Sequence, residues 1–216
     1  MSPPVFVYGF SRSGTSMVCG VLAARGLDFG GDLRLADEYN PRGYWEAKGG
    51  RTTLKRFLRQ HKFDGDGKRR YPQWVAPPKA IKRLRRAMAP HWAQADALKI
   101  ATDWLLWGTV HAAYPRARWV IVRRPVPDIV ASCMRAPFIT ICPDGTPEEV
   151  WTAKIENEVR VLEALHASPC NTVEVWPDPR RPEVFREAVL HAGAVWDEEA
   201  VRAALDPSLW KGAAHA

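Results

Sequence analysis

Short apolar runs alternate with helical patterns along most of the chain. The run PVFVY at 4–8 is followed by a Gly- and Ser-rich turn and then by MVCGVLAARG, whose apolar spacing is helical and which Gly26 would end. The same order recurs as ALKIA at 97–101, a helix near 104–114, the strand WVIV at 119–122 and a helical pattern from Asp128. The pattern ends with a long amphipathic helix over about 147–167, a short strand at 171–176 and two further helices. The alternation predicts an α/β fold with a mostly parallel sheet flanked by helices, in which ligands bind at the carboxyl ends of the strands.

The segment 28–78 interrupts this alternation. It is rich in Gly, Pro and charged residues, as in NPRGYWE and FDGDGKRRYPQW, and is predicted to be an irregular insertion over the sheet edge with one helix near 51–61. The chain has 216 residues and no internal repeat, so a single domain over 1–216 is expected.

Composition narrows the class of protein. The hydrophobic fraction of 46% and the charged fraction of 25% are typical of globular proteins. No run of about 18 apolar residues occurs, and the start MSPPVFVYGF lacks a basic segment before a long apolar stretch, so neither a spanning helix nor a signal peptide is predicted. Four scattered cysteines without a CxxC pair favour reduced thiols over a zinc site. We therefore expect a cytoplasmic protein with no membrane partner and no metal.

A net charge of +7 implies an anionic partner. The densest basic stretch, KAIKRLRRAM at 79–88, places its lysines and arginines around a helix whose buried stripe would be Ile81, Leu84 and Met88. Such runs are most often solvated helix faces, and the alternative here is one wall of an anionic site.

The strongest local signal is VFVYGFSRSGTSM at 5–17, a strand that enters a phosphate-loop-like turn before a helix. Backbone N–H groups and the helix dipole make such a turn a cradle for an anion. Compared with the nucleotide loop GxxxxGK[ST], the spacing from Gly9 to Gly14 is kept, but Thr15 replaces the lysine that reaches the β- and γ-phosphates, which disfavours ATP or GTP hydrolysis. Arg12 could supply the missing charge; the alternative is a Ser/Gly turn that only caps a helix. The hydroxyl donors of the loop are Ser11, Ser13, Thr15 and Ser16.

A second anion-binding pattern follows the strand WVIV in WVIVRRPVPDIVAS. An arginine at the carboxyl end of a strand and a serine at a helix start can converge on one dianion. Arg124 and Ser132 are eight residues apart, although Pro125 leaves Arg123 as the second candidate. A surface Arg-Arg pair is the alternative.

Together these motifs resemble the sulfotransferases that use 3′-phosphoadenosine 5′-phosphosulfate (PAPS). The family's first signature has the form PRSGTT or PKSGTT, and FSRSGTS departs from it at Phe10 and Ser11. Its second signature is a strand followed by an arginine and, eight residues after the arginine, a serine. In the family these residues bind the 3′-phosphate. Bacterial members of the family contain segments that resemble NPRGYWE at 40–46 and LKIATDW before YPRARWVIV. Some members also have a C-terminal RKG loop, which WKG at 210–212, with Lys211, resembles.

The resemblance implies PAPS as co-substrate without a metal. Arg12 and the loop amides would hold the phosphosulfate, and Lys99 would lie near its bridging oxygen. The expected base is Glu46, which lies beside two aromatic residues in a Gly-containing loop. Asp103 is the second candidate and His111 a weaker one. Either carboxylate could instead form an ion pair with a nearby arginine. The cofactor-binding residues so implied are Ser11, Arg12, Ser13, Gly14, Thr15, Ser16, Arg123, Arg124 and Ser132.

The expected acceptor is a hydroxyl or amine on a small molecule or glycan, whose identity the sequence leaves open together with the oligomeric state. Trp45, Trp74, Trp104 and Trp107 could line its pocket or pack in the core. Two other functions stay open: a P-loop-like small-molecule kinase and a basic nucleic-acid-binding module. A kinase is disfavoured because Thr15 occupies the position of the phosphate-binding lysine. The basic stretch lacks the interleaved aromatic residues expected of a nucleic-acid site, so we expect no nucleic-acid partner.

Overall fold

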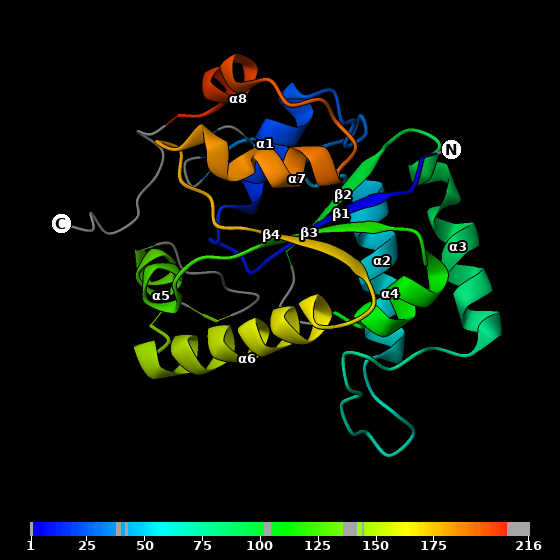
Figure 1. The fold of residues 1–216 in the computed structure, drawn as a ribbon. Coiled ribbons are helices and arrows are strands. Elements are labelled where there is room, and N and C mark those ends of the chain that lie inside the picture. The colour runs from blue at the N-terminus through cyan, green and yellow to red at the C-terminus, as the bar shows by residue number, and fades with distance from the viewer. Residues whose placement is uncertain are drawn as a thin grey trace.

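One parallel sheet organises the molecule (Figure 1). The computed structural model describes residues 2–37, 40, 41, 43–101, 105–135, 142, 143 and 145–206. Within these residues the sheet has the strand order β2-β1-β3-β4, and every pair of neighbouring strands is parallel. The strands are β1 (Val5–Tyr8), β2 (Ala97–Ile100), β3 (Arg118–Val122) and β4 (Asn171–Val175). The predicted α/β fold with a parallel sheet is confirmed.

Helices cover both faces of the sheet (Figure 1). One face carries α1 (Thr15–Ala24), α7 (Arg186–His191), preceded by the 3-10 turn η1 (Pro182–Phe185), and α8 (Glu198–Ala204). The other face carries α2 (Lys48–His61), α3 (Pro78–Trp92), α4 (Trp107–Ala113) and α6 (Glu148–His166). The helix α5 (Val126–Arg135) follows β3 and packs against α6.

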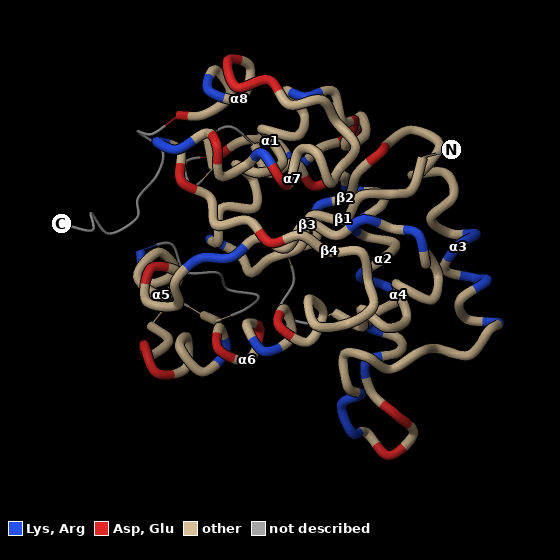
Figure 2. Tube along the Cα trace, viewed as in Figure 1, with Lys and Arg blue, Asp and Glu red and all other residues tan. Residues whose placement is uncertain are grey.

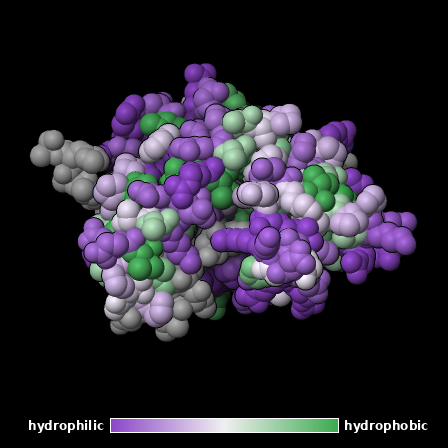
Figure 3. Space-filling model, turned by 90° about the horizontal axis from the view of Figure 1, so that it is seen from below, coloured by the Kyte–Doolittle hydropathy of each residue, from purple (hydrophilic) through white to green (hydrophobic). Residues whose placement is uncertain are grey.

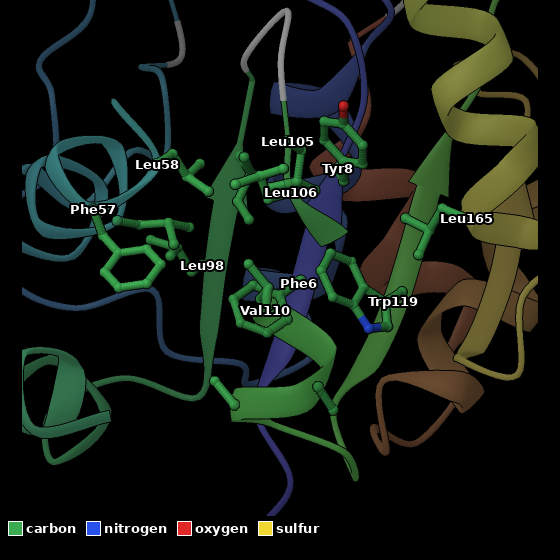
Figure 4. Close-up of a cluster of buried hydrophobic side chains, with 14 of the residues drawn as sticks. Phe6, Tyr8, Phe57, Leu58, Leu98, Leu105, Leu106, Val110, Trp119 and Leu165 are labelled. Atoms are coloured by element: carbon green, nitrogen blue, oxygen red, sulfur yellow. The ribbon is translucent and has the colours of Figure 1, made fainter. Parts of the chain in front are cut away.

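The alternation of side chains along the strands builds two core layers. In β1, Val5 and Val7 face α1, whereas Phe6 and Tyr8 face the layer of α2, α4 and α6 (Figure 4). Phe6 stacks on Trp119 of β3 with ring centroids 4.6 Å apart. Because β1 and β3 are the two inner strands, apolar residues are required on both of their faces, which explains their nearly unbroken apolar runs.

The basic helix α3 is a largely solvated face, with two differences from the sequence-based expectation. Its buried stripe is Ala80, Leu84 and Met88, spaced every four residues, while Ile81 is half-buried. In addition, Arg85 donates from Nε to the carbonyl of Ala113 at 2.7 Å, and thereby satisfies the carboxyl end of α4.

The segment 28–78 contains α2, which begins at Lys48, three residues before the expected start. Leu54, Phe57 and Leu58 are buried on its inner face. The helix packs beside the edge strand β2 and against α3. It therefore stands next to the carboxyl end of β2, where a ligand of a parallel sheet would bind.

The end of β1 is tied to α6 by a buried pair. The hydroxyl of Tyr8 donates to Glu158 of α6, and both residues are fully buried. We expect Tyr8→Phe to lower the free energy of unfolding by about 1–3 kcal/mol, because a buried carboxylate loses a donor. Tyr71→Phe, on a side chain that is 77% exposed, is the matched control and should be neutral in the same urea titration. Equal stability of the two variants would contradict this role of the pair.

Candidate active site

The loop between β1 and α1 is closed tightly on itself. Ser13 donates to the carbonyl of Phe10 both from its N–H (3.2 Å) and from Oγ (2.7 Å), and Phe10 is buried. Arg12 and Gly14 have φ values of 72° and 94°, in the left-handed region. Glycine tolerates that conformation, whereas Arg12 is strained by it, as residues at functional loops often are.

The amino end of α1 is open toward this loop. Gly14 occupies the N-cap position without a side-chain cap, and no acidic residue lies in the first turn. Within the described part of the chain, no acceptor is bonded to the N–H groups of Gly14, Thr15 or Ser16. Unsatisfied N–H groups and the positive end of a helix dipole form an anion-binding site, so the predicted cradle is present as geometry.

The second predicted motif meets the loop. Arg12 donates from Nε to Ser132 Oγ at 3.0 Å, and Arg124 donates to the backbone carbonyl of Arg12 at 2.9 Å. Two guanidinium groups and a hydroxyl thus converge from segments more than 110 residues apart. Such a cluster suits a dianion, which can take charge-assisted hydrogen bonds from both arginines.

The two neighbouring arginines point in opposite directions. Arg124 is buried and lies 3.7 Å from Asp128; burial lowers its pKa, while Asp128 acts to raise it. Arg123 instead pairs with Glu174 of β4 at 3.0 Å and with Glu163 of α6 at 3.4 Å. The structure therefore brings Arg124 to the loop and leaves Arg123 in an ion-pair cluster on the other side of the sheet.

Lys99 reaches the loop from the carboxyl end of β2. Its side chain is 3% exposed, and Nζ donates to Ser16 Oγ and to the carbonyl of Tyr44, each at 2.8 Å. Burial lowers the pKa of Lys99, and the nearby Glu46 acts to raise it. Lys99 is therefore a buried side chain held at the loop and not an exposed surface lysine.

Glu46 is buried between two cations. Its Oε1 lies 3.7 Å from Lys99 Nζ, and its Oε2 lies 2.9 Å from Arg51 Nε. The arginine pairing that was the alternative to a catalytic base is thus present. Oε1 stays beyond hydrogen-bond distance of Lys99 and keeps capacity to accept a proton donor.

A comparison with protein families matches this site. The model of the sulfotransferase family covers residues 3–167, which include the loop, Glu46, Lys99, Arg124 and Ser132. The chain belongs to the sulfotransferase family. The resemblance predicted from the two signatures is thereby confirmed, and a transferase activity follows from it.

Among solved structures, the sulfotransferase STF1 from Mycobacterium tuberculosis H37Rv is similar over 94% of this chain and 71% of that chain, with 16% identity and a TM-score of 0.44. A search of curated protein sequences finds no significant match. Across the described ranges, no group of three or more His, Cys, Asp or Glu residues is placed to hold a metal. Of the helices that the structure describes, none combines the length and the apolar character needed to cross a bilayer.

Two residues of this sulfotransferase site were missed from the sequence. Asn40 donates from Nδ2 to Ser16 Oγ at 2.7 Å, and Arg51 holds Glu46 from the first turn of α2. Asn40 begins the NPRGYWE segment, so the resemblance already contained a signal for it. Arg51 had no such signal, because only the path of the chain before α2 brings it back to Glu46.

The remaining predicted residues are placed as follows. Ser11 lies half-buried in the loop, and His111 lies in the last turn of α4. Trp45 packs edge-on against Phe29 with centroids 5.7 Å apart, and Trp74 stacks with His61. Trp107 packs against the core. Asp103, Trp104 and Lys211 lie outside the described residues.

The loop leaves no room for a side chain at Gly9. A Cβ atom there would lie 2.7 Å from the carbonyl oxygen of Val122 and 2.8 Å from Ser13 Oγ. We expect Gly9→Ala to lower the free energy of unfolding by about 1–3 kcal/mol through overpacking. Gly31→Ala, where nothing lies within 4 Å, should change it by less than about 0.5 kcal/mol in parallel thermal unfolding. A stable Gly9→Ala variant would show that the loop opens more readily than its contacts indicate.

Proposed function

We propose that this sulfotransferase moves a sulfuryl group from PAPS to a hydroxyl or amine of a small-molecule or glycan acceptor and releases adenosine 3′,5′-bisphosphate. The observation that carries the proposal is the convergence of Arg12, Arg124 and Ser132, with contacts of 2.9 and 3.0 Å, beside the open amino end of α1. A donor with two separate anionic groups needs two such anion sites within one molecule's reach.

Each anion site has a proposed ligand. The loop amides from Gly14 to Ser16, with Arg12, hold the 5′-phosphosulfate, because they combine N–H donors with a positive charge. Arg124 and Ser132 hold the 3′-phosphate. Arg124 is already fixed by the carbonyl of Arg12 and by Asp128, so little side-chain entropy is lost on binding.

The reaction places one demand on each group. The bond between sulfur and the bridging oxygen breaks, its electron pair stays on the bisphosphate, and the acceptor's oxygen or nitrogen forms the new bond to sulfur while its proton goes to a base. Arg12 and Lys99 stabilise the charge on the leaving phosphate, which is the main catalytic contribution available to such a transfer. Buried Lys99 acts there with little screening by water.

Glu46 is the proposed base. It lies 3.7 Å from Lys99, so a carboxylate and an ammonium stand next to each other, as acceptor activation and leaving-group stabilisation require. Arg51 Nε lies 2.9 Å from Oε2 and holds the carboxyl group in place beside Lys99. Asp103 is kept as the second candidate.

The other functions weighed from the sequence have less support. A kinase would need the lysine that Thr15 replaces, and membership of the sulfotransferase family favours sulfuryl transfer. Nucleic-acid binding would give no role to the cluster of Arg12, Arg124, Lys99 and Glu46, of which all but the half-buried Arg12 are buried.

A reducing compartment, the cytoplasm, is proposed on the state of the cysteines. Cys19, Cys133, Cys142 and Cys170 are all free and buried. Burial raises the pKa of Cys19 and of Cys133 to about 12, so these thiols are unreactive packing groups.

The direct test is calorimetry with adenosine 3′,5′-bisphosphate, ATP and a random DNA duplex. We expect the bisphosphate to bind more tightly than the other two. In a separate activity assay, we expect Arg12→Ala to reduce PAPS turnover at least tenfold, since a charge-assisted contact to a developing anion is worth about 2–4 kcal/mol. Preferential binding of ATP would favour the kinase, preferential binding of DNA the nucleic-acid module, and unchanged turnover would refute the loop assignment.

Substitution of the adjacent arginines tests the 3′-phosphate site. Arg124→Ala should raise the KM for PAPS more than it lowers kcat, because the 3′-phosphate is remote from the transferred group. Arg123→Ala, the matched control, should leave the KM unchanged, since its partners are Glu163 and Glu174. The reverse result in steady-state assays would move the phosphate site by one residue.

Glu46→Gln tests the base. We expect this variant to fold and to bind the bisphosphate while its turnover falls by roughly 10² to 10⁴. Asp103→Asn should lower turnover only slightly. Rate profiles across pH discriminate a base from a positioning residue, because only removal of the base abolishes the acidic limb. A mild Glu46→Gln with a severe Asp103→Asn would transfer the role to Asp103.

A further inference from the structure

The hydroxyl oxygen of Ser16, in the first turn of α1, accepts two hydrogen bonds. Lys99 donates to it from Nζ at 2.8 Å, and Asn40 donates to it from Nδ2 at 2.7 Å. An ammonium group has no acceptor, so the direction of the bond from Lys99 is fixed. Because a hydroxyl oxygen has two lone pairs, these two donors use its whole capacity to accept.

The proton of this hydroxyl group is therefore left for a third atom. Among the described residues, none accepts a hydrogen bond from Ser16 Oγ. Ser16 is half-buried and lies beside the N–H groups at the open amino end of α1. A serine hydroxyl in a helix often turns to a nearby backbone carbonyl instead. Here the two donors hold the oxygen, so the proton is available to a ligand at this end of the helix.

Asn40 is held in place by its own stretch of chain. Its N–H donates to the carbonyl of Asp37 at 3.1 Å and to Asp37 Oδ1 at 3.0 Å, and its carbonyl accepts from the N–H of Gly43 at 2.9 Å. Gly43 has a φ of 83°, which glycine adopts without strain. The next residue, Tyr44, accepts from Lys99 Nζ through its carbonyl at 2.8 Å. One short stretch of chain thus places both donors.

Long-range charge does not supply this kind of order. Residues 48–92 contain fourteen lysines and arginines and only two acidic residues. Figure 2 shows the basic residues along α3 and in the segment between α2 and α3, and Figure 3 shows hydrophilic side chains over this part of the molecule. Exposed charges attract an anion to the protein, but salt screens them and they do not fix the direction of any one bond. A short hydrogen bond from an oriented donor does fix that direction.

We infer that Asn40 is a positioning residue for the sulfuryl donor. Together with Lys99 it fills both lone pairs of Ser16 Oγ, and it thereby directs the hydroxyl proton to the anion at the amino end of α1. The inference rests on the proposed function and deepens it, because the group held beside Ser16 has to be a hydrogen-bond acceptor, as the ionised oxygens of a phosphosulfate are. The hydroxyl is oriented before the ligand arrives, which lowers the entropy cost of binding.

A double-mutant cycle between Asn40 and Ser16 tests the inference. The probe is adenosine 3′,5′-bisphosphate, which keeps the 5′-phosphate of PAPS, and its Kd is measured by calorimetry. Ser16→Ala should weaken binding about tenfold, because it removes a charge-assisted hydrogen bond. Asn40→Ala should weaken binding about threefold, because the hydroxyl can then turn away. In the Ser16→Ala background it should have no effect, because Asn40 acts through Ser16.

Asn40→Asp separates orientation of the hydroxyl from simple tethering of the segment. The carboxylate keeps the size of the side chain and a contact with Ser16, but it can only accept, so it takes the hydroxyl proton away from the ligand. Its added charge also repels the bisphosphate, in either background. We therefore expect Asn40→Asp to weaken binding about tenfold more when Ser16 is present than in the Ser16→Ala background.

Asn157→Asp, which adds the same charge at an exposed position of α6, is the matched control and should leave the Kd within about twofold. Thermal unfolding verifies that each variant folds, and the Asn40→Asp comparison decides by itself if Asn40→Ala does not fold. If Asn40→Asp has the same effect in both backgrounds, or if Ser16→Ala binds normally, the inference is wrong while the proposed function stands. If the unaltered protein does not bind the bisphosphate, the proposed function fails first.

Discussion

The open amino end of α1 at the end of the central strand is the constraint around which the site is arranged. The adjoining loop admits no side chain at Gly9, and no side chain caps the N–H groups of the first turn. Arg12, Arg124 and Lys99 all reach this point, and the carboxylates of Asp128 and Glu46 balance part of their positive charge. A bound dianion would offset the electrostatic cost of the charge that remains.

The ion pairs around Glu46 limit that cost. Lys99 and Glu46 are both nearly fully buried, and a buried charge without a partner would be far more destabilising than the pair. Ser16 and the carbonyl of Tyr44 complete the hydrogen bonds of Lys99, so the ammonium is held in one place. A fixed ammonium stabilises developing charge without reorganising during the reaction, which is the property that catalysis by positioning requires.

The segment around α2 connects this charge network to the surface. It supplies Glu46 and Tyr44 to the interior, Arg51 to the boundary and the basic residues of the outer face. The same stretch of chain also reaches the amino end of α1, where Asn40 donates to Ser16 Oγ.

The sequence by itself determined the elements and the contiguous loop, because period-two and helical patterns and the run GFSRSGTS are local properties. Only the tertiary structure decided which arginine faces the loop. Side chains of β3 alternate between faces, so Arg123 follows Trp119 and Ile121 toward α6, and Arg124 follows Val120 and Val122 toward α1. The alternation can be read from the sequence, but which face holds the loop depends on how the helices pack. The sequence indicated an arginine partner for Glu46 only as an alternative and did not identify Arg51 or Lys99, since these pairings depend on the path of an irregular segment that no periodic pattern specifies.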